Sequence, residues 1–212
     1  VLLLDQHFMK TLYLGPKYDL SHIEGDKCTS MDVAKLLEGR NIVAIFQGRS
    51  EAGPRALGNR SILYDPRDPN GKDRVNRVKR RESFRPFAGT IKLHTVHEWF
   101  DMAGLEESPF MMYAVDVRPE KKDLIPAILH VDDTCRIQTL SLEQNPNYYR
   151  LIDAFCQQTG VPILFNTSFN LSGEPLVETP EDAIKTFEGS GIDYLYFPEV
   201  QINLPLHVAR IF

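Results

Sequence analysis

The sequence predicts a single α/β domain in which helices flank a mixed β-sheet. Its 212 residues are 42% apolar, enough to bury a substantial core. Short continuous apolar runs, typical of buried strands, alternate with segments of helical periodicity. Helices and strands do not alternate strictly, and no internal repeat is present, so a mixed sheet is favoured over a doubly wound parallel one.

The first predicted helix spans residues 30–38, where Ser30 can cap the start and Gly39 ends it. The next region of helical composition spans residues 72–82 and carries Val75 and Val78 among basic residues.

Two further helices lie in the second half of the chain. One spans residues 148–159 and stops at Gly160. The other begins with Thr179 as its cap and Pro180 at its first position. The predicted strands or extended segments are residues 41–46, 84–91, 110–117, 135–140, 161–165 and 194–197.

Charge is distributed unevenly. A net charge of -5 argues against a surface that coats nucleic acid, because such proteins are usually basic overall. Nevertheless, residues 49–85 hold 11 of the 24 basic residues, so the overall charge hides a local basic region.

Several classes of protein are excluded. The cysteines Cys28, Cys135 and Cys156 are isolated, so we expect neither disulfides nor a cysteine metal site, and a reducing cytoplasm fits best. No apolar run approaches the roughly 20 residues that span a bilayer, so no membrane role is expected. His94 and His97 lack further ligands nearby in sequence, and no protein-bound metal is predicted.

The first motif that suggests a chemical role is the loop from Gly48 to Arg60, which follows a predicted buried strand. Ligands of α/β sheets commonly bind at such strand ends. Its glycines allow close approach of the backbone to a ligand, and its arginines offer planar donor pairs for phosphate or carboxylate oxygens. The alternative is a basic surface turn.

The second motif spans residues 77–87. On a continuous helix Arg77 and Arg81 would project from one face, while Lys79 points elsewhere. Arg85 has aromatic and proline neighbours in the sequence. The alternative interpretation, a basic helix face exposed to solvent, does not explain these neighbours. Several cations around one pocket would stabilise a triphosphate and the charge that develops as pyrophosphate leaves.

Two polar segments complete the set. Residues 166–173 follow a predicted strand with hydroxyl and amide side chains that can bind phosphate and ribose oxygens, or alternatively form a capping turn. Residues 130–136 place a histidine, two carboxylates and Arg136 at a strand entry, which could equally be an ordinary turn.

In combination, these motifs resemble the O-carbamoyltransferases of the NodU/CmcH group, specifically their C-terminal domain. The matching segments are Arg49-x-Glu51-x-Gly-Pro-Arg-Ala-Leu-Gly58, Lys79-x-Arg81-Glu82-x-Phe84-Arg-Pro-Phe87, His130-Val-Asp and Asn166-Thr-Ser-Phe-Asn170. The resemblance covers roughly residues 26–200. It implies a twisted mixed sheet similar to the YrdC-like fold of threonylcarbamoyl-adenylate synthases.

The activity implied is formation of carbamoyl-adenylate from carbamoyl phosphate and ATP, with Mg²⁺ accompanying ATP. A preceding actin-like, metal-containing domain would then pass the carbamoyl group to the hydroxyl of a small acceptor molecule. Residues 26–212 would form the adenylate-forming domain, and residues 1–25 a linker or tail of the preceding one. The start at Val1, without methionine, also suggests a piece of a longer polypeptide. A homo-oligomer is left open.

The resemblance also implies residue roles. Catalytic roles fall to Lys79, Arg85 and Arg136. Roles in binding substrate or nucleotide fall to Arg49, Glu51, Gly53, Arg55, Gly58, Arg81, Asn166, Thr167, Ser168 and Asn170. This sequence departs from the family pattern at Gly89, Asp133 and Cys135.

Two other interpretations stay open. One is a non-catalytic module that binds nucleotide or RNA, since similar folds can bind double-stranded RNA through a basic concavity. The other is a domain whose site is completed only by the missing part.

Overall fold

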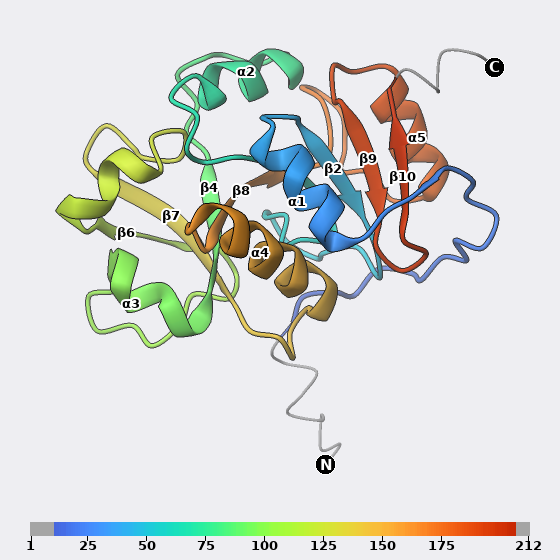
Figure 1. Cartoon of the computed structure of the whole chain (residues 1–212). Coiled ribbons are helices and arrows are strands. Elements are labelled where there is room, and N and C mark those ends of the chain that lie inside the picture. Colours follow the sequence, from blue (N-terminus) through green and yellow to red (C-terminus); the bar gives the residue numbers. More distant parts are fainter. Residues whose placement is uncertain (1–10, 207–212) are drawn as a thin grey trace.

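The computed structural model of the protein describes residues 11–206. Within that range all strands join one twisted mixed sheet with helices packed on it, which confirms the predicted α/β class (Figure 1). The strand order across the sheet is β1-β10-β9-β2-β3-β8-β4-β7-β6-β5. The pairs β2–β9 and β4–β7 are parallel, and the other neighbouring pairs are antiparallel.

The strands are β1 (Asp26–Lys27), β2 (Val43–Phe46), β3 (Arg60–Tyr64), β4 (Ala88–Lys92), β5 (Phe100–Asp101), β6 (Tyr113–Val117), β7 (Thr134–Leu140), β8 (Ile163–Ser168), β9 (Tyr194–Phe197) and β10 (Ile202–Pro205). The helices are α1 (Ser30–Glu38), α2 (Gly71–Val78), α3 (Val96–Trp99), α4 (Pro146–Thr159) and α5 (Pro180–Glu188), with 3₁₀ turns at Leu93–Thr95 and Pro119–Leu124. Helices α1 and α4 pack side by side on the sheet (Figure 1), and α5 contacts β2 and β9.

Helix ends follow the capping chemistry of the sequence. Thr179 forms a capping box with Asp182, as expected from its position before Pro180. At α1 the cap is Thr29, one residue before the predicted Ser30, and it forms the same box with Asp32. Gly160 ends α4 with a left-handed φ of 74°.

The prediction of one helix over residues 72–82 is wrong at its C-terminal end. Helix α2 stops at Val78, because Arg80 takes a φ of 53° and the Arg81 amide turns back to the Asn76 carbonyl. Arg77 and Arg81 therefore do not share a helix face.

Several strand predictions also need correction. Residues 60–64 form β3, for which no strand was predicted, and Arg60 begins this strand although it was assigned to the preceding loop. Asn166, Thr167 and Ser168 belong to strand β8 and not to a polar loop, since they pair with β3 and β4. β10 and the two-residue strands β1 and β5 had no predicted counterpart.

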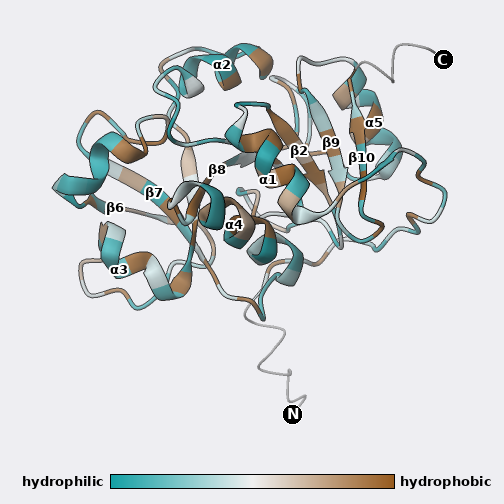
Figure 2. Cartoon of the chain, in the orientation of Figure 1, coloured by the Kyte–Doolittle hydropathy of each residue, from teal (hydrophilic) through white to brown (hydrophobic). Residues whose placement is uncertain are grey.

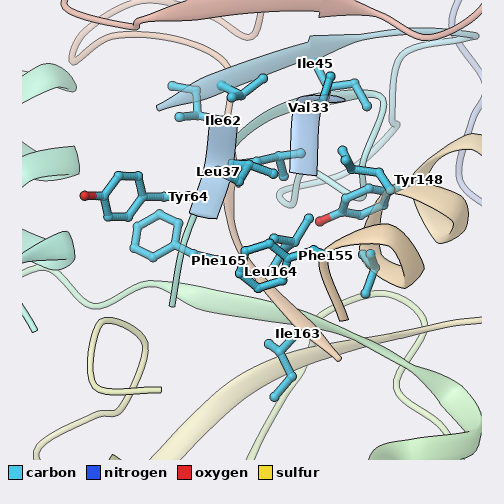
Figure 3. Close-up of a cluster of buried hydrophobic side chains, with 14 of the residues drawn as sticks. Val33, Leu37, Ile45, Ile62, Tyr64, Tyr148, Phe155, Ile163, Leu164 and Phe165 are labelled. Carbon is cyan, nitrogen blue, oxygen red and sulfur yellow. The ribbon is translucent and has the colours of Figure 1, made fainter. Parts of the chain in front are cut away.

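The core lies between the sheet and the helices. Apolar residues concentrate on the central strands and the inner sides of the helices, as Figure 2 shows. Figure 3 shows Val33 and Leu37 of α1 and Phe155 of α4 meeting side chains of β3 and β8. This packing fixes β8, whose last residues line the site described next.

Candidate functional site

The site is built on one row of paired residues that crosses the sheet. Asn166 of β8 pairs with Ala88 of β4, which pairs with Arg136 of β7, which pairs with Ala114 of β6. Directly paired residues point to the same side of a sheet. The small Ala88 side chain leaves space between Asn166 and Arg136.

The loop over this row is organised by the buried carboxylate of Glu51. Its Oε1 accepts from the backbone amides of Leu57 (2.8 Å), Asn59 (2.7 Å) and Arg60 (3.2 Å). Burial raises the pKa of Glu51, while these amides counteract the rise. Glu51 therefore stabilises the loop through its backbone amides and does not line the pocket.

Two predicted glycines have the backbone freedom that this loop needs. Gly53 and Gly58 have φ values of 112° and 108°. A Cβ at Gly58 would lie 2.2 Å from the Tyr148 ring, so the loop can approach α4 only because this residue has no side chain.

Hydrogen bonds attach the loop to the strands. The Ala56 carbonyl accepts from Asn166 Nδ2 (3.2 Å), and the Leu57 carbonyl accepts from Gln138 Nε2 (3.1 Å). Between loop and strands lies a pocket of about 100 Å³. Its lining residues are Pro54, Arg55, Ala56, Arg81, Met111, Arg136, Asn166, Thr167 and Ser168.

The pocket is strongly electropositive. Arg55 Nε, Arg81 Nη2 and Arg136 Nε are buried and find no hydrogen-bond partner within residues 11–206. Burial lowers the pKa of Arg81 to about 10, with help from Arg85 and Arg136; burial and then Arg55 lower the pKa of Arg136. An anion in the pocket would offset the repulsion among these buried cations and accept from their unused donors.

Arg81 is the most firmly oriented of the three arginines. Its Nε donates to Asn76 Oδ1 (2.6 Å), and its guanidinium lies 4.2 Å from the centre of the Phe87 ring. These contacts on both sides of the side chain leave Nη2 for the pocket.

The Asn166 side chain both forms hydrogen bonds within the protein and lines the pocket. Its Nδ2 donates to the loop and to Thr90 Oγ1 (3.0 Å), whereas its buried Oδ1 has no partner among the described residues. Oδ1 can therefore accept a hydrogen bond from a ligand that carries an N–H group.

Other predicted residues lie next to the pocket or away from it. Lys79 is buried beside the pocket, against Ser168 and Asn170. Arg85 is half exposed and pairs with Glu82 (Nε–Oε2 3.0 Å). Arg49 donates to the Gly15 carbonyl (2.9 Å) and does not line the pocket.

Sequence reasoning missed three kinds of contributor. The sequence gives no sign that Ala88 and Met111 contribute to the pocket, because Ala88 only leaves space for it and Met111 only closes it. Arg60 appeared only as part of a basic loop, yet it is fully buried, 3.6 Å from the centre of the Phe46 ring. Its Nη1 donates to the Gln47 carbonyl (2.6 Å), so it fixes the base of the loop.

No group of three or more histidine, cysteine, aspartate or glutamate side chains in residues 11–206 could hold a metal ion. In the same range no helix is long and apolar enough to cross a membrane.

The geometry defines an α/β domain with a small arginine-lined pocket, and comparison with known proteins identifies its family. The chain belongs to the carbamoyltransferase C-terminus family, whose model matches residues 34–203. It is 46% identical to the nodulation protein NolNO of Sinorhizobium fredii over 178 residues, or 82% of this chain and 26% of that protein. It is 38% identical to a 3'-hydroxymethylcephem-O-carbamoyltransferase of Amycolatopsis lactamdurans over 165 residues, or 76% of this chain and 30% of that enzyme.

Solved structures confirm the predicted YrdC-like fold. Full-length HypF in a phosphate- and nucleotide-bound form superposes with a TM-score of 0.55 at 20% identity, covering 79% of this chain and 27% of HypF. The Sua5 protein of P. abyssi in complex with L-threonine has the same TM-score at 13% identity, covering 79% of this chain and 46% of Sua5. The chain spans about a quarter to a third of the length of the curated relatives it matches.

Proposed function

We propose that this chain is the carbamoyl-adenylate-forming domain of an ATP-dependent O-carbamoyltransferase. The reaction balances as carbamoyl phosphate, water and ATP giving carbamoyl-adenylate, inorganic phosphate and pyrophosphate. Carbamoyl phosphate first loses its phosphate to water, and an oxygen of the resulting carbamate then attacks the α-phosphorus of ATP as the bond to pyrophosphate breaks.

The observation that carries the proposal is the set of unused guanidinium donors of Arg55, Arg81 and Arg136. Arginine forks match phosphate oxygens in geometry and charge. The pocket of about 100 Å³ is small, and its arginine lining suits one phosphoryl or carbamoyl phosphate group. The remainder of ATP would extend outward from it.

The residue types suit this chemistry. Departure of phosphate and pyrophosphate needs charge neutralisation and alignment more than a protein nucleophile. The arginines would neutralise the leaving phosphate, and Asn166 Oδ1 would accept from the carbamoyl NH₂ group. Mg²⁺ would arrive with ATP as part of that substrate.

Transfer to an acceptor is assigned to another part of the longer protein. There the acceptor hydroxyl oxygen would attack the carbamoyl carbon, AMP would leave, and the hydroxyl proton would pass to a base. The names of relatives such as the cephem O-carbamoyltransferase support this second step.

Binding can be tested by calorimetric titration of the chain with carbamoyl phosphate. The expected result is binding that Arg136→Met weakens at least about tenfold, since charge-assisted hydrogen bonds have that scale. Folded protein that binds neither carbamoyl phosphate nor ATP would refute the proposal. Salt-sensitive affinity for double-stranded RNA without pyrophosphate release would favour the RNA-binding alternative.

A further inference from the structure

Residues 12–15, which we call the docking segment, pair with the start of the arginine-rich loop. Tyr13 and Glu51 form an antiparallel β-bridge outside the main sheet. Next to this bridge the Ala52 amide donates to the Leu12 carbonyl (2.7 Å). Backbone hydrogen bonds therefore join a segment far upstream in the sequence to the loop.

Gly15 lets the docking segment and the loop approach closely. Its amide and that of Leu14 both donate to the Ser50 carbonyl (3.1 Å each), and its own carbonyl accepts from Arg49 Nη1 (2.9 Å). A Cβ on Gly15 would overlap Ser50 Oγ, so only glycine fits at this contact. The contact holds the end of the docking segment against residues 49–50.

The Tyr13 hydroxyl reaches the far end of the loop. It donates to the Leu57 carbonyl (2.9 Å) and accepts from Asn145 Nδ2 (3.2 Å). The Leu57 carbonyl also accepts from Gln138 Nε2 of β7, so donors from two separate elements fix it. Burial, followed by the charge of Glu51, raises the pKa of Tyr13, which keeps the hydroxyl protonated and able to donate.

The docking segment also supports the pocket with apolar side chains. Leu12 and Tyr13 pack against a small buried cluster of Leu57, Ala88 and Met111. Met111 lines the pocket, and Ala88 lies in the row of paired strand residues under the loop. The segment therefore contacts both the loop and the apolar part of the pocket wall.

We infer that Tyr13 is a positioning residue: it lies outside the pocket lining, and it holds the loop so that Arg55 faces the pocket. The buried Arg55 Nε has no hydrogen-bond partner within residues 11–206, so the place of this side chain depends on the backbone that carries it. The inference rests on the proposed function, because the place of Arg55 matters only if a phosphate group binds there.

Tyr13→Phe tests the hydroxyl alone, because the ring that packs on Leu57 is retained. The variant should fold, since both groups that lose the hydroxyl keep another partner. The Leu57 carbonyl keeps Gln138, and Asn145 Nδ2 keeps Asn59 Oδ1 (2.8 Å).

A double-mutant cycle with Arg55→Met separates positioning from a general effect on the fold. The readout is the calorimetric affinity of the full chain for inorganic phosphate. We expect Tyr13→Phe to weaken binding at least about threefold and Arg55→Met at least about tenfold. In the Arg55→Met background, Tyr13→Phe should change the affinity less than about 1.5-fold, because the group that it positions is gone.

Tyr149→Phe is the matched control, since it removes an exposed hydroxyl that contacts His94 Nδ1 (3.4 Å), and it should leave phosphate affinity unchanged. Tyr13→Phe that weakens binding by the same factor in both backgrounds would overturn the inference. So would Tyr13→Phe that binds phosphate as tightly as wild type.

A second measurement uses wild-type protein and so does not depend on any variant folding. Coupling between two sites is reciprocal, so phosphate must stabilise the docking segment if the segment favours phosphate binding. Saturating phosphate should therefore slow the hydrogen exchange of the Leu14 and Ala52 amides, followed by NMR. The Cys28 amide, which donates to the Gln201 carbonyl (2.9 Å) next to the edge strand β1, should exchange as before.

Unchanged exchange of the Leu14 and Ala52 amides in protein saturated with phosphate would overturn the inference. Wild-type protein that binds no phosphate would instead refute the proposed function, and the inference with it.

Discussion

At the scale of single residues, the pocket differs from ordinary surface charge in having donors without acceptors. Arg74 and Arg85 make ion pairs with carboxylates in the folded protein. Arg55, Arg81 and Arg136 instead keep unpartnered buried nitrogens around one small space. Burial without a partner lowers stability, and three such cations around one space are what the proposed phosphate site would use.

Replacing Arg136 with methionine should lower carbamoyl phosphate-dependent ATP–pyrophosphate exchange on the order of 10²-fold, because preorganised charges at a reacting phosphate have that effect. The melting temperature should stay the same or rise, since like-charge repulsion with Arg55 and Arg81 is removed. Arg150→Met, on the exposed side of α4, is the matched control and should leave exchange unchanged. An Arg136 variant that simply unfolds would indicate a structural role.

Lys79 should make stability depend on pH. Burial, followed by the charge of Arg81, lowers its pKa to about 7, against about 10.4 for an unfolded lysine. Between these values the unfolded chain binds one more proton, so the free energy of unfolding should rise with pH, by up to about 1.4 kcal/mol per unit. Denaturation of wild type and Lys79→Met from pH 6 to 9 should show this extra slope only in wild type. Equal slopes would mean that the lysine keeps an ordinary pKa.

At the scale of elements, the pocket depends on a loop attached to one carboxylate. Glu51 gathers three backbone amides of the 57–60 segment. In Glu51→Ala these buried donors would lose their acceptor, at a cost of about 3 kcal/mol in the free energy of unfolding. Urea denaturation should detect this loss. A phosphate titration should show weaker binding, because Arg55 belongs to the same loop. A variant as stable as wild type would contradict the assigned role.

Close packing of the loop on α4 can be tested at Gly58. Gly58→Ala combines a φ of 108° with a Cβ only 2.2 Å from the Tyr148 ring, so we expect a loss of more than about 2 kcal/mol. Gly104→Ala is the matched control, since it has a φ of 85° and no atom within 4 Å of its Cβ. It should cost only the backbone strain, on the order of 1 kcal/mol. Similar losses at both positions would show that the contact with Tyr148 is unimportant.

At the scale of the whole molecule, the sequence predicted the fold class and the longest elements. Helices α1, α4 and α5 were found because caps and apolar periodicity agree there. Strands β1 and β5 could not be predicted, because two residues carry no periodic pattern. The true end of α2 depends on the left-handed conformation of Arg80, which tertiary contacts such as its bond to Gly189 stabilise.

The candidate site was only partly predictable for a similar reason. Sequence patterns located Arg55, Arg81, Arg136 and residues 166–168 but could not tell which cations face a common space. Cross-strand register decides that Ala88 separates Asn166 from Arg136. Burial decides that Glu51 and Lys79 face inward, and neither property can be read from local spacing.

The most direct test of the central claim is exchange of labelled pyrophosphate into ATP by this chain, with and without carbamoyl phosphate, in the presence of Mg²⁺. The proposal predicts exchange that requires carbamoyl phosphate, together with carbamoyl-adenylate detectable by mass spectrometry. Protein that binds ATP and carbamoyl phosphate yet catalyses no such exchange would contradict the assignment of adenylate formation to this domain.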